Sequence, residues 1–188
     1  MTIFEYIMVM VSIILALALA QLLRAVADLL TSARRYWVHI VWVISLVLIV
    51  VQFWWAYWDF NAVETWTFDT YLAVLLAPTL IFLQANLLAP TNRGANWDWK
   101  AHFNSVSAWF FGIFVLMTLT GIVVSVIYLS APVLHPYRGF QFVLLGLACV
   151  GLAVKSDKAQ GTLAVTFLSV FLISQAVVRM NLGALATV

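Results

Sequence analysis

The sequence is short of charge. Lys, Arg, Asp and Glu make up only 9% of its 188 residues, against about 25% in a typical soluble domain. So few charged side chains cannot cover the surface of a soluble domain of this length. The basic residues also form no cluster of the kind that binds nucleic acid. We therefore expect neither a soluble domain nor a nucleic-acid partner.

Cysteine and enzyme motifs are scarce too. The single cysteine, Cys149, lies in an apolar run, which excludes a disulfide framework and a thiolate metal site. The Gly-x-Ser-x-Gly motif of serine hydrolases, the His-Glu-x-x-His motif of zinc peptidases and the lysine loop that binds phosphate are missing. We therefore predict a protein that is not an enzyme, with no catalytic residues, no metal site and no cofactor.

Apolar residues are abundant instead. They make up 65% of the chain, and the mean hydropathy is +1.08. A helix needs about 20 apolar residues to cross about 30 Å of hydrocarbon, and six apolar runs reach or approach that length. The predicted fold is an all-α integral membrane protein, a bundle of six transmembrane helices forming a single transmembrane domain. The predicted spans are 3–23, 37–58, 70–89, 105–129, 139–154 and 162–182.

The basic residues alternate between the gaps that separate these spans. The first, third and fifth gaps hold seven of the nine Lys and Arg residues, and the opposite side holds only Arg138 and Arg179. Basic loops are retained on the cytoplasmic side of a membrane. The pattern predicts a multi-pass protein of the plasma (inner) membrane with both termini outside the cytoplasm.

The side predicted to lie outside is acidic. Asp59 follows the second span, and Glu5 and Arg179 lie near the same side on the first and last spans. We predict an outer mouth formed by Glu5, Arg179 and Asp59, in which Glu5 and Arg179 pair if their helices are neighbours. An acidic mouth raises the local concentration of cations.

Uncharged polar side chains occur inside the spans, whereas no charged residue falls in the central third of any span. That absence argues against a voltage sensor and a proton pump. Amides are not left unpaired in lipid, so they must face other helices or a wet cavity. The predicted transport pathway comprises Gln84, Gln175, Thr79 and Gln52. Hydrogen bonding between helices is the alternative role for the same residues.

Two further features concern the third span. Pro78 lies near its middle, where we expect a kink. The residues Leu72-Ala73-Val74 and Gln84-Ala85 recur 91 residues later as Leu163-Ala164-Val165 and Gln175-Ala176. This match suggests two inverted three-helix halves, as in many transporters, although no similar match relates the other spans.

Histidine supports a different hypothesis. His39 and His102 are predicted at the cytoplasmic side of the second and fourth spans. Two imidazoles on facing helices can ligate a b-type haem. Hydrogen bonding to a headgroup or to the backbone is the alternative role for these side chains.

The sequence leaves three functions open. The leading one is channel-like or facilitator-like movement of a small solute or cation through the bundle or through a homo-oligomer of it. The second is a non-catalytic accessory or scaffold subunit of a larger membrane complex. The third is a b-type haem redox protein. In each case membrane lipid is a partner.

Overall fold

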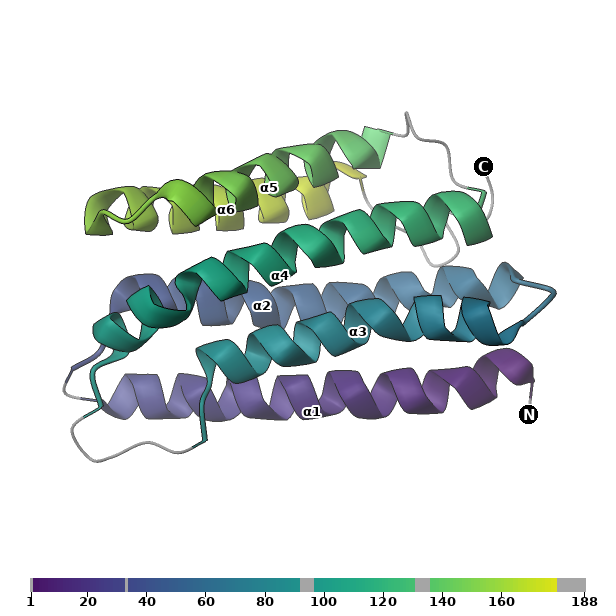
Figure 1. Cartoon of the computed structure of the whole chain (residues 1–188), viewed down its shortest axis with the longest axis horizontal. Coiled ribbons are helices and arrows are strands. Elements are labelled where there is room, and N and C mark those ends of the chain that lie inside the picture. The colour runs from purple at the N-terminus through teal and green to yellow at the C-terminus, as the bar shows by residue number, and fades with distance from the viewer. Residues whose placement is uncertain (1, 33, 92–96, 131–135, 179–188) are drawn as a thin grey trace.

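The protein is a bundle of antiparallel helices, and the structure is a computed structural model that describes residues 2–32, 34–91, 97–130 and 136–178 (Figure 1). No strand occurs in these ranges, so the all-helical prediction is confirmed. The elements are α1 (Ile3–Thr31), α2 (Trp37–Ala56), the 3-10 helix η1 (Tyr57–Ala62), α3 (Phe68–Leu88), α4 (Trp99–Tyr128), α5 (Pro136–Ala153) and α6 (Asp157–Val178).

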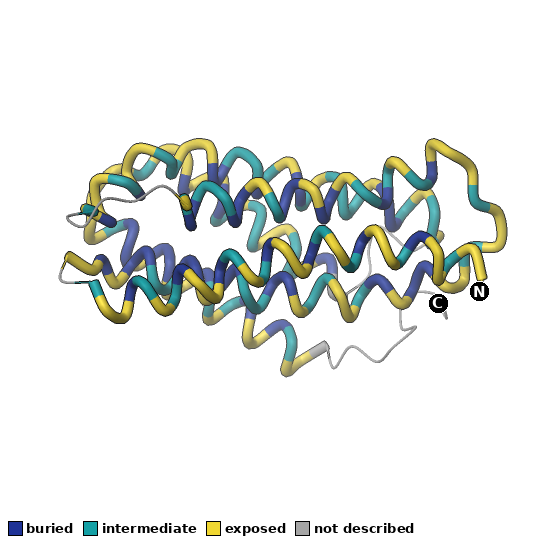
Figure 2. Tube along the Cα trace, turned by 90° about the horizontal axis from the view of Figure 1, so that it is seen from below, coloured by how far each residue is buried: buried dark blue, intermediate teal, exposed yellow. Residues whose placement is uncertain are grey.

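Five of these helical segments are long and apolar enough to cross a membrane: α1, α2 together with η1, α3, α4 and α6. The 18 residues of α5 span about 27 Å at 1.5 Å per residue, and this shorter apolar helix runs along α4 and α6 (Figure 1). Exposed residues run along the outer sides of the helices over the length of the bundle (Figure 2). The chain is therefore a multi-pass integral membrane protein.

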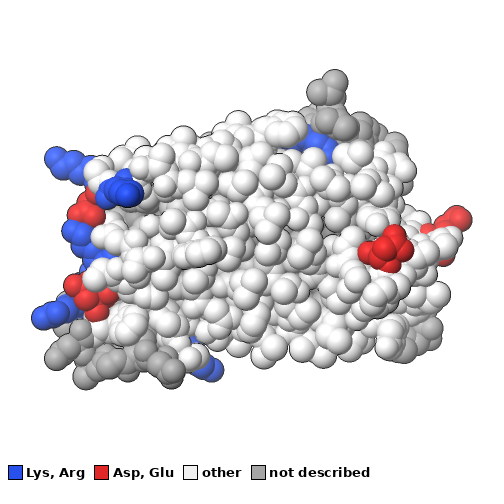
Figure 3. Space-filling view, viewed as in Figure 1, with Lys and Arg blue, Asp and Glu red and all other residues white. Residues whose placement is uncertain are grey.

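Charge divides the two ends of the bundle (Figure 3). One end, called the basic end below, carries Arg24, Arg34, Arg35, Lys100, Lys155 and Lys158 together with Asp28, Asp98 and Asp157. There Lys100 of α4 forms an ion pair with Asp157 of α6. The other end, called the acidic end, carries Glu5, Asp59, Glu64 and Asp69, together with Arg138. Antiparallel threading brings alternate connections to the same end, which explains the alternation of basic residues along the sequence.

The two three-helix halves are packed differently. In the first half, α1, α2 and α3 all pack against one another. In the second half, α5 packs against both α4 and α6, while α6 also packs against α2 of the first half. Helix α2 therefore lies at the centre and contacts α1, α3, α4 and α6.

Two glycines allow close approach of helices in the second half. A Cβ atom at Gly151 of α5 would lie 2.6 Å from Cδ1 of Phe111 on α4, and one at Gly161 of α6 would lie 2.7 Å from Cζ2 of Trp37 on α2. Small residues permit such contacts between membrane helices. The aromatic rings thus occupy the space that a larger residue would fill.

Replacing Gly151 with alanine is expected to lower the free energy of unfolding by about 1–3 kcal/mol, because the added methyl group overpacks the contact with Phe111. Gly146→Ala on the same helix is the control, since a Cβ there meets nothing within 4 Å. That control should leave stability unchanged or raise it by up to about 1 kcal/mol through helix propensity. Unfolding in mixed SDS micelles measures both variants, and equal stabilities would contradict the close contact.

Pro78 leaves one backbone carbonyl of α3 without its helical donor, and a side chain of η1 replaces that donor. Proline has no N–H, so the carbonyl of Val74, four residues earlier on α3, loses its helical donor. The hydroxyl of Tyr57 in η1 donates to that carbonyl at 2.6 Å, and the bond is buried. Backbone groups in a membrane must be satisfied within the protein, and here η1 supplies the partner.

Candidate functional site

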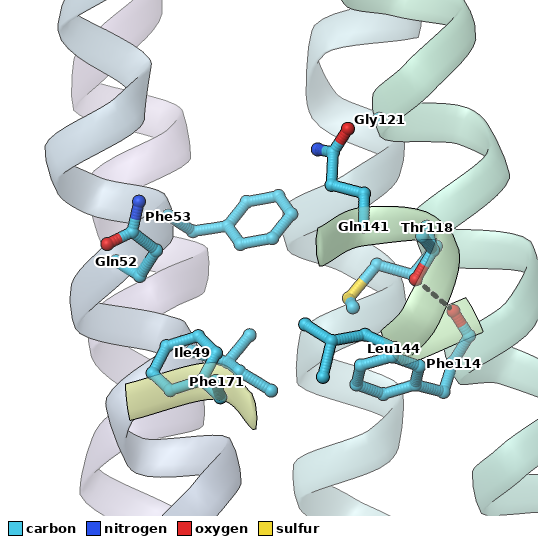
Figure 4. A pocket seen from close by; sticks show the side chains of 10 residues that line it. Ile49, Gln52, Phe53, Phe114, Thr118, Gly121, Gln141, Leu144 and Phe171 are labelled. Carbon is cyan, nitrogen blue, oxygen red and sulfur yellow. Dashed lines mark hydrogen bonds between the residues drawn. The ribbon is translucent and has the colours of Figure 1, made fainter. Parts of the chain in front are cut away.

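A partly open cavity of about 80 Å³ lies between the helices, nearer the acidic end. A buried water needs about 10–15 Å³ of such space, so the cavity has room for a few waters or for a solute of a few heavy atoms. Helices α2, α4, α5 and α6 form its walls (Figure 4). Its lining residues are Ile49, Gln52, Phe53, Phe114, Met117, Thr118, Gly121, Gln141, Leu144 and Phe171.

Two carboxamides supply the polar character of this cavity. Gln52 extends from α2 and Gln141 from α5, on opposite sides of the cavity (Figure 4). Thr118 is also part of the lining, but its hydroxyl donates to the carbonyl of Phe114 at 2.9 Å, as Figure 4 shows. The remaining lining is mostly aromatic and aliphatic. Small-molecule sites commonly combine an apolar wall with a few such polar groups.

A buried arginine orients one of these carboxamides. Arg138 is only 4% exposed, and its Nη1 donates to Oε1 of Gln141 at 3.3 Å. Its Nη2 donates to Oγ of Ser125 on α4 at 2.9 Å. Because the oxygen of Gln141 accepts from Arg138, the amide nitrogen is directed away from Arg138 and both its N–H groups remain as donors for a ligand. That nitrogen is turned toward the Gln52 side of the cavity (Figure 4).

The lining of the cavity carries no charge of its own. None of the ten lining residues is an Asp, Glu, Lys or Arg, and the Arg138 guanidinium lies behind Gln141. The site therefore offers a ligand hydrogen bonds from uncharged groups and apolar contacts.

Aromatic rings fill the bundle on the basic side of the cavity. Trp42 of α2 lies two helical turns, or about 10 Å, from Ile49. Its ring centroid is 5.4 Å from that of Phe110, 5.1 Å from Phe111 and 5.0 Å from Phe167. All four side chains are fully buried. We call Trp42, Phe110, Phe111 and Phe167 the aromatic plug, because they separate the cavity from the basic end.

The structure does not bring the four predicted pathway residues together. Gln52 lines the cavity, whereas Gln84 is buried between α3 and α4, where its Nε2 donates to the carbonyl of Phe110 at 3.2 Å. Gln175 on α6 donates to the neighbouring Ser174 hydroxyl at 3.2 Å. Thr79 is exposed and donates to the carbonyl of Leu75 on its own helix at 2.8 Å.

Two residues predicted at the outer mouth, Glu5 and Asp59, lie at the acidic end but do not line the cavity. Glu5 forms a capping box at the start of α1, where its carboxylate accepts from the backbone N–H of Thr2 at 2.8 Å. Asp59 is buried within η1. The rings of Phe4 and Trp58 are 6.1 Å apart and join α1 to η1. Arg179 lies outside the described residues.

Sequence reasoning missed Arg138 and Gln141. They lie three residues apart on α5, which places them on the same helical face, and that spacing was the available signal.

The structure does bring His39 and His102 together, with ring centroids 6.1 Å apart. Their Nε2 atoms, however, bond to the carbonyls of Leu88 and Leu87 at 2.9 and 2.8 Å. The last carbonyls of a helix lack intrahelical donors, so the two imidazoles, each with its proton on Nε2, cap the end of α3.

A third helix completes this cap, since Gln21 of α1 donates to the carbonyl of Ala89 at 2.7 Å. The rings of Trp99 and Phe103 lie 5.0 and 5.7 Å from that of His39 and occupy its surroundings. Both Nε2 atoms thus bond to the backbone of α3 and are not directed at a shared iron, so this pair does not fit a haem.

Together the fold and the cavity define a multi-pass α-helical membrane protein with a mostly apolar cavity that two carboxamides line. Comparison of the chain with protein-family models, with curated proteins and with solved structures finds no match.

Proposed function

We propose that the protein is a facilitator that moves a small uncharged or anionic solute across the membrane. The observation that carries the proposal is the intramembrane cavity between α2, α4, α5 and α6, with Gln52 and Gln141 on opposite sides. The size of the cavity limits the solute to a few heavy atoms, such as urea, glycerol or formate. The positive-inside rule supports a cytoplasmic basic end, so that the solute enters the cavity from outside.

The lining residues support an uncharged or anionic solute over a cation. A cation would enter a cavity that no carboxylate lines. It would lose its hydration without gaining a negatively charged partner. A carbonyl, hydroxyl or carboxylate oxygen would instead accept from the amide nitrogen of Gln141.

The aromatic plug supports a gated facilitator over an open pore. Fully buried rings lie between the cavity and the basic end, so passage requires these rings to move. Each solute molecule would then be held in the cavity before it is released toward the basic end.

Flux into proteoliposomes of the purified protein tests the proposal. We expect uptake of urea, glycerol or formate above that of empty vesicles, and no added flux under K⁺, Na⁺ or H⁺ gradients. Gln141→Leu should lower the flux about tenfold, the equivalent of losing about 1.4 kcal/mol of interaction. Gln175→Leu is the control, because Gln175 is not among the lining residues. Folded protein with no flux for any probe would overturn the proposal in favour of an accessory subunit.

A further inference from the structure

Two complementary polar atoms, one in the aromatic plug and one on α3, are buried without hydrogen-bond partners. Among the described residues, the indole Nε1 of Trp42 has no acceptor and Oε1 of Gln84 has no donor. Trp42 is 1% exposed and Gln84 is 0% exposed. Orphaned buried groups are rare in native proteins, and inside a membrane no bulk water can satisfy them.

Both atoms belong to side chains that contact one residue, Phe110 of α4. The ring of Trp42 lies 5.4 Å from the ring of Phe110, centroid to centroid, and Nε2 of Gln84 donates to the Phe110 carbonyl. Helix α2, which carries Trp42, also packs against α3, which carries Gln84. The two side chains therefore contact the same residue where α2, α3 and α4 meet, and we call this place the junction.

We infer that a small uncharged molecule binds at this junction, accepting from the indole N–H of Trp42 and donating to the carboxamide oxygen of Gln84. A carboxylate such as formate has no proton to donate to Gln84, and a metal cation or an ammonium ion has no lone pair to accept from Trp42. Water satisfies both atoms, and so does a neutral solute that carries hydroxyl or amide groups. The packed rings limit the resting occupant to the size of water.

This inference extends the proposed function, on which its second part rests. A solute that leaves the cavity toward the basic end must pass the aromatic plug, where Trp42 and Gln84 offer it a donor and an acceptor. The junction therefore lets neutral solutes such as urea and glycerol pass faster than formate. The resting water is a property of the fold and does not depend on transport.

NMR of the full chain in lipid nanodiscs, with ¹⁵N-labelled tryptophan, tests the bound water. The Trp42 indole signal is assigned by its loss in Trp42→Phe. We expect a cross-peak between the Trp42 indole proton and water, and we expect Gln84→Met to remove that cross-peak and shift the indole proton upfield. Gln175→Met should change neither. The other eight of the nine tryptophans report whether each variant is folded.

A Trp42 indole proton that shows no contact with water in the wild-type protein overturns the inference. So does an indole signal that is unchanged in a folded Gln84→Met variant. Failure of the proposed function looks different, because it gives no flux while the water cross-peak remains. Flux without that cross-peak would support the facilitator and overturn only the inference of a bound water.

Discussion

Gly121→Leu is expected to reduce solute flux to the level of empty vesicles while the protein stays folded. Gly121 lines the cavity, and a Cβ there meets nothing within 4 Å. The leucine side chain can therefore grow into open space, and its four carbons occupy most of the 80 Å³ cavity. Burying a leucine contributes about 1.5–3 kcal/mol, and replacing a helical glycine contributes up to about 1 kcal/mol. Transport and stability should thus change in opposite directions.

Gly112→Leu is the matched control. Gly112 lies on the same helix, and a Cβ there also meets nothing within 4 Å, but Gly112 does not line the cavity. The substitution should keep wild-type flux in the same vesicle assay. Wild-type flux through Gly121→Leu would mean that the solute does not pass through the cavity. Equal losses in both variants would point to a general effect of bulk on α4.

The arrangement of the helices could be predicted from the sequence because it follows from the length of each apolar run and from the order of the runs along the chain. Hydrocarbon thickness sets the length of each apolar run, and antiparallel threading brings alternate gaps to the same end. The predicted ranges differ from the helices mainly at the basic end. There α1 continues to Thr31 and α4 begins at Trp99, because polar residues near the headgroups remain helical without being apolar.

The composition of the site could not be predicted in the same way. In a soluble helix the polar face marks the outside, but a membrane helix is apolar on both its lipid-facing and its buried side. Gln52 and Thr79 are both polar residues within apolar runs, yet only Gln52 lines the cavity. Thr79 satisfies its hydroxyl on its own helix and faces outward. Which polar residue faces inward depends on helix rotation, and rotation is set by contacts such as Phe111 on Gly151.

For the histidine pair, too, the location could be predicted from the sequence but the binding partners could not. The sequence predicted that His39 and His102 lie at the same end, and the structure places their rings side by side. What they bind depends on where α3 ends, because its last carbonyls are the acceptors. No motif in either histidine segment specifies that neighbour.

Tyr57→Phe is expected to lower the free energy of unfolding by about 1–3 kcal/mol, because it leaves a buried carbonyl without a donor. Val74 lacks its helical donor because of Pro78, and the Tyr57 hydroxyl at 2.6 Å replaces it. Tyr6→Phe is the control, since Tyr6 is 64% exposed and surface changes usually stay within about 0.5 kcal/mol. Unfolding in mixed SDS micelles measures both.

The double variant separates this mechanism from simple loss of packing. In a Pro78→Ala background the alanine N–H can donate to Val74, so Tyr57→Phe should then have an effect below about 0.5 kcal/mol. The two sites should therefore be coupled by about 1–2 kcal/mol, within the range for residues that share a hydrogen bond. Loss of packing alone would give the same effect of Tyr57→Phe in both backgrounds. A coupled result would mean that η1 is retained at the acidic end because it satisfies the carbonyl that Pro78 exposes, and that the two residues must change together.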